Sequence, residues 1–73
     1  MDQKTFMEKM QDLLEREDEL NLDMSLEDID EWDSLSFVAF LAMADKVPGN
    51  RATPEAIRDA KTVGDLYALV KAD

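Results

Sequence analysis

Apolar residues recur along this chain at the three- and four-residue spacing of helix faces. The first face predicts a helix over residues 3–16 and consists of Phe6, Met10, Leu13 and Leu14. Another predicts a helix over residues 63–72 and consists of Val63, Leu66, Tyr67 and Val70. Thr62 and Asp65 have capping-box spacing at its start. For the first helix, Thr5 with Glu8 also has this spacing, and Asp2 offers a slightly earlier start.

Capping and helix-breaking residues predict two further helices in the middle of the chain. Asp33 is a good N-cap for a helix over residues 34–46. Pro48 and the glycine after it end that helix, because both residues favour turns. Pro54 follows a threonine and suits the first position of a short helix over residues 54–60.

The predicted connection over residues 17–33 is long for a compact chain. Its apolar residues can pin it to a core: Leu20, Leu22, Met24, Leu26, Ile29 and Trp32. Ser25 with Asp28 is suited to capping a short turn. Residues 20–26 alternate like a strand, but a single strand would have no partner. We therefore predict an all-α fold, a four-helix bundle with a long first loop and a short third helix, in one domain over residues 1–73.

The predicted second helix is apolar on both sides. One side has the spacing of a core stripe: Phe37, Phe40, Leu41 and Ala44. The opposite side consists of Leu35, Val38, Ala39 and Ala42. Three other short helices can hardly cover both sides, although a helix that is apolar all round is normally buried. The surplus side is a candidate partner surface, unless the long connection folds back over it.

Charge is concentrated in the first half of the chain. The 73 residues carry 18 acidic and 8 basic side chains, a formal net charge of −10. Residues 1–34 hold 13 of the acidic and 3 of the basic residues, so the second half is neutral overall. This balance argues against nucleic acid and anionic membranes as partners, because both require basic patches. It favours partners with a positive docking surface.

The chain contains neither Cys nor His. Their absence excludes thiolate metal sites, Cys nucleophiles and a Ser–His–Asp triad. No segment approaches the roughly 20 apolar residues of a membrane span. The first residues also lack the layout of a signal peptide, so we expect a cytoplasmic location. A monomer is the default expectation, with a weak dimer through the surplus apolar side as the alternative. The acidic run over residues 23–33 fits a calcium loop in neither register, because the required glycine is missing, and no metal site is predicted.

Ser34 stands beside the predicted start of the second helix, where free backbone N–H groups favour an attached anion. A serine at this place is more often a simple cap, so its spacing leaves both interpretations open. The tripeptide Asp33-Ser34-Leu35 resembles the phosphopantetheine attachment motif of acyl carrier proteins. The resemblance covers nearly the whole chain: its length, acidity, long first loop, apolar second helix, short third helix and the closing segment 61–66.

The resemblance implies a carrier whose Ser34 is esterified by 4′-phosphopantetheine. A phosphopantetheinyl transferase (holo-carrier synthase) would supply this arm from coenzyme A with magnesium, and Asp33 would assist the transfer. The arm's thiol would hold an acyl or aminoacyl group as a thioester, so the chain itself would not be an enzyme. A loading ligase and a downstream acyltransferase or synthase would be its other partners. The acyl-pocket candidates are Phe37, Phe40 and Leu41, with ordinary core packing as the alternative.

The chain departs from the carriers of fatty-acid synthesis, whose second helix has an acidic exposed face. The matching positions here are Ser36, Ala39 and Ala42. The expected partner contacts are therefore apolar and loop residues: Leu35, Val38, Ala39, Ala42, Asp28, Asp30, Glu31 and Asp33. Trp32 makes the motif more similar to D-alanyl and other stand-alone carriers, which favours an aminoacyl or short acyl cargo. The alternative is a non-covalent helical adaptor, a degenerate carrier that binds a partner through this helix.

Overall fold

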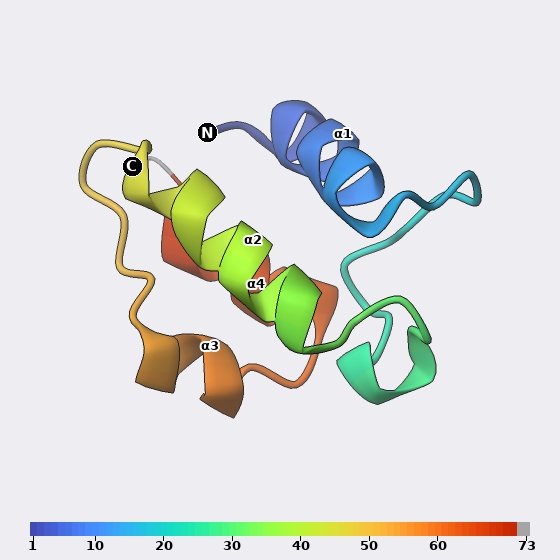
Figure 1. Ribbon diagram of the computed structural model, residues 1–73. Coiled ribbons are helices and arrows are strands. Elements are labelled where there is room, and N and C mark those ends of the chain that lie inside the picture. Colours follow the sequence, from blue (N-terminus) through green and yellow to red (C-terminus); the bar gives the residue numbers. More distant parts are fainter. Residues whose placement is uncertain (72–73) are drawn as a thin grey trace.

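A computed structural model describes residues 1–71 of this chain (Figure 1). The helices within them are α1 (Gln3–Leu14), α2 (Ser34–Asp45), α3 (Pro54–Asp59) and α4 (Val63–Val70), and a short 3-10 helix, η1 (Leu26–Asp28), lies in the first connection. These residues form no strand, and Ser25 pairs with Thr62 only as an isolated bridge. The all-helical class and the absence of a strand over residues 20–26 are thus confirmed. None of the described helices is long and apolar enough to cross a bilayer.

The first helix begins at the earlier of its two predicted starts and ends sooner than predicted. The Asp2 carboxylate accepts a hydrogen bond from the backbone N–H of Thr5 at 2.8 Å, so Asp2 is the N-cap. The helix ends at Leu14, and the predicted end at residue 16 is wrong. Glu15 adopts the left-handed conformation, with φ of 53°, which turns the chain out of the helix.

The three later helices begin where predicted. Asp33, Thr53 and Thr62 are N-caps, and each side chain accepts a backbone N–H three residues later. The predicted capping box of α4 is confirmed, since its third residue reaches back to the cap. α2 and α3 each end one residue earlier than predicted. α4 ends at Val70, and the predicted end at residue 72 lies outside the described residues.

The core draws side chains from every helix. Its largest fully buried members are Phe6, Met10, Ile29, Phe40, Ile57, Val63, Leu66 and Val70. α1 and α3 lie on opposite sides of α2, and α2 contacts both (Figure 1). The rings of Phe6 and Tyr67 pack 5.0 Å apart, which joins α1 to α4. α2 therefore lies centrally, and one of its sides is used for packing.

Backbone hydrogen bonds pin the long connection to the start of α4. The N–H of Gly64 donates to the carbonyl of Leu22 at 2.8 Å, and the N–H of Val63 donates to the carbonyl of Met24 at 3.0 Å. A Cβ atom at residue 64 would lie 2.9 Å from that carbonyl oxygen of Leu22, so only glycine fits here without a shift.

The end of the connection is anchored by one short turn and one ring contact. The predicted turn is present as η1, but its capping differs from the prediction. Backbone N–H of Asp28 donates to the carbonyl of Ser25 at 3.0 Å, and the Ser25 side chain makes no capping bond. Further on, the rings of Trp32 and Phe40 pack in a T-shaped arrangement, with centroids 6.3 Å apart. This contact holds the residues just before α2 against the core.

Candidate functional site

Ser34 is the first residue of α2, and its side chain is exposed. Asp33 forms the N-cap, and its Oδ1 accepts the backbone N–H of Ser36 at 3.0 Å. Within residues 1–71 no hydrogen bond engages the Ser34 hydroxyl, whereas the cap bond joins Asp33 just before it to Ser36 two residues after it. The serine is thus presented to solvent on a helix start that is itself fixed.

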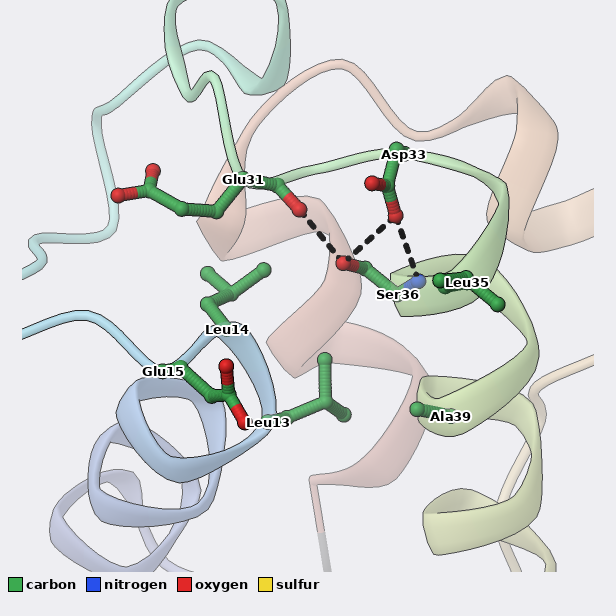
Figure 2. A pocket seen from close by; sticks show the side chains of 8 residues that line it. All are labelled: Leu13, Leu14, Glu15, Glu31, Asp33, Leu35, Ser36 and Ala39. Carbon is green, nitrogen blue, oxygen red and sulfur yellow. Dashed lines mark hydrogen bonds between the residues drawn. The ribbon is translucent and has the colours of Figure 1, made fainter.

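Ser36 is the buried polar side chain of this region, with 5% of its surface exposed. Its hydroxyl donates to the carbonyl oxygen of Glu31 at 2.6 Å and lies 3.2 Å from Asp33 Oδ1, as Figure 2 shows. The assignment of Ser36 to the exposed face of the helix was therefore wrong. The reason is local: the capping interaction turns the third helical residue back towards the preceding segment.

The carboxyl group of Asp33 keeps its charge in more acidic solution than an ordinary aspartate. The N–H of Ser36 holds the pKa of Asp33 below its usual value, and the Ser36 hydroxyl bond acts in the same direction. Hydrogen bonds to a carboxylate stabilise its charged form, which is the physical cause of this shift. Near neutral pH the cap is thus an anion beside Ser34.

Arg16 holds the same segment from the side of α1. Its Nη1 lies 3.0 Å from Glu31 Oε1, and its Nε is buried without a hydrogen-bond partner among the described residues. The side chains of Arg16 and Glu31 are 17% and 38% exposed. Glu31, predicted as a partner contact, is therefore half-buried and already engaged in an ion pair within the chain.

A cavity of about 410 Å³ lies beside this helix start, between α1 and α2 (Figure 2). Its apolar wall comes from both helices and includes Leu14 and Leu35. Three acidic residues, Glu15, Glu31 and Asp33, also line the cavity. The residues before and after Ser34 thus line an open space, so the serine is not crowded by α1.

The apolar side of α2 remains uncovered. Leu35 and Val38 are 80% and 61% exposed, and Ala39 and Ala42 are exposed as well. The long connection does not fold back over this side. Among the predicted acidic contacts, the side chains of Asp28, Asp30 and Asp33 are exposed.

The three acyl-pocket candidates lie in different settings. Phe40 is fully buried in the core against Trp32. Phe37 is half-buried, and the Arg58 guanidinium lies 5.6 Å from the centre of its ring. Leu41 is also half-buried and lines a surface groove of about 410 Å³. An acyl pocket formed by all three stays a prediction.

The sequence interpretation missed two residues of this site. Ser36 stands three positions after Asp33, the capping-box spacing, and that signal was available. Arg16 and Glu31 lie 15 residues apart in a region of irregular backbone, and no local pattern connects them. Only the folded chain brings these two side chains together.

The chain matches no protein-family model, no curated protein and no solved structure. Within residues 1–71 no three carboxylates are grouped as a set of metal ligands. The interpretation of the site therefore depends on its geometry and on the chemistry of its residues.

Proposed function

We propose that this chain is a carrier of the acyl carrier protein type. In this proposal the chain is a four-helix bundle with a long first loop and a short third helix. It holds an acyl or aminoacyl group as a thioester on a 4′-phosphopantetheine arm attached to Ser34. The observation that carries the proposal is the exposed and unbonded hydroxyl of Ser34 at the first position of α2, next to an exposed apolar face.

The surroundings of Ser34 are compatible with such an arm. Ser34 is exposed, so an extended group attached to its oxygen meets solvent and not the packed core. When bound, the arm supplies a thiol, which the chain lacks because it has no Cys. The chain's own part is to hold the attachment point in place. Asp33 caps α2, and Trp32, the residue before the cap, packs against Phe40 in the core.

In this proposal the chemistry takes place in the active sites of the partners, and the chain catalyses no step. The partners are a phosphopantetheinyl transferase, a loading ligase and a downstream acyltransferase or synthase. The uncovered apolar face, whose large exposed side chains are Leu35 and Val38, is proposed to dock them. Exposed carboxylates at Asp28 and Asp30 favour basic groups on the partner. Tethering then raises the effective concentration of the cargo at each active site.

We assign an aminoacyl or short acyl group as the cargo. Phe40 is fully buried, and the Trp32 ring packs against it in a T-shaped arrangement, so this part of the core is filled by the protein's own side chains. The Arg58 guanidinium over Phe37 covers the half-buried ring on the side of α3. A small cargo needs no shelter in the core and can remain at the surface.

The test is an intact-mass measurement after incubation with coenzyme A, magnesium and a broad-specificity phosphopantetheinyl transferase. The wild type is expected to gain one phosphopantetheinyl group, and Ser34→Ala is expected to gain none. Ser25→Ala is the matched control, because it removes a serine from the long connection and leaves Ser34 in place. No gain in folded wild-type protein, with a known carrier modified in parallel, would overturn the proposal.

A second candidate is a non-covalent adaptor. The exposure of Leu35 and Val38 favours it, because an uncovered apolar face can bind a partner without any arm. The adaptor predicts that binding to a partner survives Ser34→Ala and is lost in Val38→Asp. The carrier predicts that both variants fail in a pathway assay, the first through loss of the arm and the second through loss of docking.

A further inference from the structure

The hydroxyl of Ser36 does more than the capping of α2 requires. The cap needs only the backbone N–H of this residue, which donates to Asp33 Oδ1 at 3.0 Å. The hydroxyl itself reaches past the cap to the carbonyl oxygen of Glu31 at 2.6 Å, in a site where Ser36 is 5% exposed. One buried side chain therefore closes the turn that begins before Asp33 and ends in the first turn of α2.

We propose that Ser36 is a positioning residue, whose hydroxyl holds the turn over residues 31–36 in the shape that presents Ser34 for modification. This inference rests on the proposed carrier function. In the sequence, Ser34 lies between Asp33, which Ser36 contacts, and Ser36 itself in the first turn of α2. With the hydroxyl bonds in place, the path of the backbone at Ser34 is fixed although its side chain has no bond of its own. Misplacement of a reacting group by about 1 Å can cost up to a hundredfold in rate.

A second restraint acts on the same turn. The Arg16 guanidinium binds the Glu31 side chain at 3.0 Å, while Ser36 binds the Glu31 carbonyl. Glu31 is thus held at two points, one from the end of α1 and one from α2 (Figure 2 shows the latter). Arg16→Gln loosens this turn without altering α2. We expect Arg16→Gln to lower the rate of phosphopantetheinylation less than Ser36→Ala does, because the ion pair is partly exposed to solvent.

The experiment measures initial rates of phosphopantetheinylation with coenzyme A, magnesium and the broad-specificity transferase, at varied concentrations of the carrier. Ser36→Ala is expected to lower kcat about tenfold and to leave KM within about twofold, because the docking face is unchanged. Ser36→Thr keeps the hydroxyl and is expected to recover most of the rate. Ser25→Ala is the matched serine control and is expected to behave like the wild type.

A spectroscopic readout separates positioning from a loss of stability. In Ser36→Ala the carboxyl of Asp33 loses the hydroxyl bond that helps to lower its pKa, so its NMR-detected pKa is expected to rise. Ser36→Thr is expected to restore it. If Ser36→Ala does not fold by circular dichroism, Ser36→Cys replaces it, because it is similar in size and is only a weak donor.

The outcomes distinguish this inference from the proposed function. A wild type that gains no arm overturns both. A modified wild type together with folded Ser36→Ala at the wild-type rate overturns the positioning role alone. A loss confined to KM also overturns it, since it would place Ser36 in docking. An equal loss in Ser36→Ala and Ser36→Thr has the same consequence, because the hydroxyl would then be irrelevant.

Discussion

The starts of α2 and α4 have the same local plan. In each, the N-cap side chain accepts the backbone N–H of the third helical residue, at 3.0 Å for Asp33 and 3.1 Å for Thr62. In each, that third residue reaches back. Asp65 accepts the N–H groups of Lys61 and Thr62 at 2.9 and 3.1 Å, whereas Ser36 donates its hydroxyl to a carbonyl before the cap.

The two starts differ in what surrounds their first two helical residues. In α4, Val63 is fully buried, and Gly64 lies directly against the backbone of Leu22. In α2, the side chains of Ser34 and Leu35 are exposed. The same capping chemistry thus produces a covered helix start and an open one. An attachment site requires the open helix start, in which hydrogen bonds fix the backbone while the side chain of the serine stays exposed to solvent.

The largest expected difference between the two helix starts is in the loss of stability on substitution of the first helical residue. Val63→Ala removes two buried methyl groups and is expected to lower the free energy of unfolding by about 2 kcal/mol, by lost burial and the cavity left behind. Ser34→Ala is expected to change it by less than about 0.5 kcal/mol, as for other exposed residues. Urea unfolding followed by the fluorescence of Trp32 measures both. Equal losses would contradict the open character of the α2 start.

Substitution of the second helical residue is expected to give a smaller difference in stability between the two starts. Gly64→Ala places a Cβ 2.9 Å from the carbonyl oxygen of Leu22. Overpacking of about 2 kcal/mol, offset by a gain of about 1 kcal/mol in helix propensity, leaves a net loss of about 1 kcal/mol. Leu35→Ala, at the equivalent place in α2, is expected to stay within about 0.5 kcal/mol. The same urea titration measures both variants. An unchanged free energy of unfolding in Gly64→Ala would show that the backbone of Leu22 shifts away at no cost.

The smallest effect concerns the charge of three carboxylates at helix starts: the N-caps Asp2 and Asp33, and Asp65 in the capping box of α4. Backbone hydrogen bonds lower the pKa of Asp2, Asp33 and Asp65 below the usual value, so each contributes stability when ionised. A lowered pKa in the folded state means that this stability is present above about pH 4 and is lost as the pH falls through the folded-state pKa. The effect is small because the carboxylates face solvent.

The test of the charged caps is a series of urea midpoints at falling pH. The triple variant Asp2→Asn, Asp33→Asn and Asp65→Asn is expected to lose less stability below pH 4 than the wild type, because an asparagine side-chain oxygen accepts backbone N–H groups without titrating. Asp45→Asn, at the far end of α2, controls for a lost surface charge. Identical slopes in wild type and triple variant would exclude the caps as a source of acid sensitivity.

Much of the fold could be predicted from local patterns. The starts of α1 to α4 lie at side chains with a capping oxygen. The caps of α2, α3 and α4 were predicted from the sequence, whereas for α1 the sequence offered two starts and the structure has the one at Asp2. Helix ends were less predictable, as the left-handed Glu15 shows, because no glycine or proline marks that position. The candidate serine and the surplus apolar side of α2 were also visible in the sequence. The burial of Ser36 was not expected, because the resemblance to fatty-acid carriers matched it to a position on their exposed helix face.

The distinction between the two helix starts is tertiary in origin. Capping depends on neighbouring residues along the chain, so the sequence alone predicts where α2 and α4 begin. Burial depends on what packs over a position from elsewhere. The long connection lies across Gly64 and Val63 through two backbone hydrogen bonds, and it leaves the apolar face of α2 open. Likewise, Arg16 meets Glu31 only after α1 and the connection have folded together, since two side chains 15 residues apart have no local reason to touch.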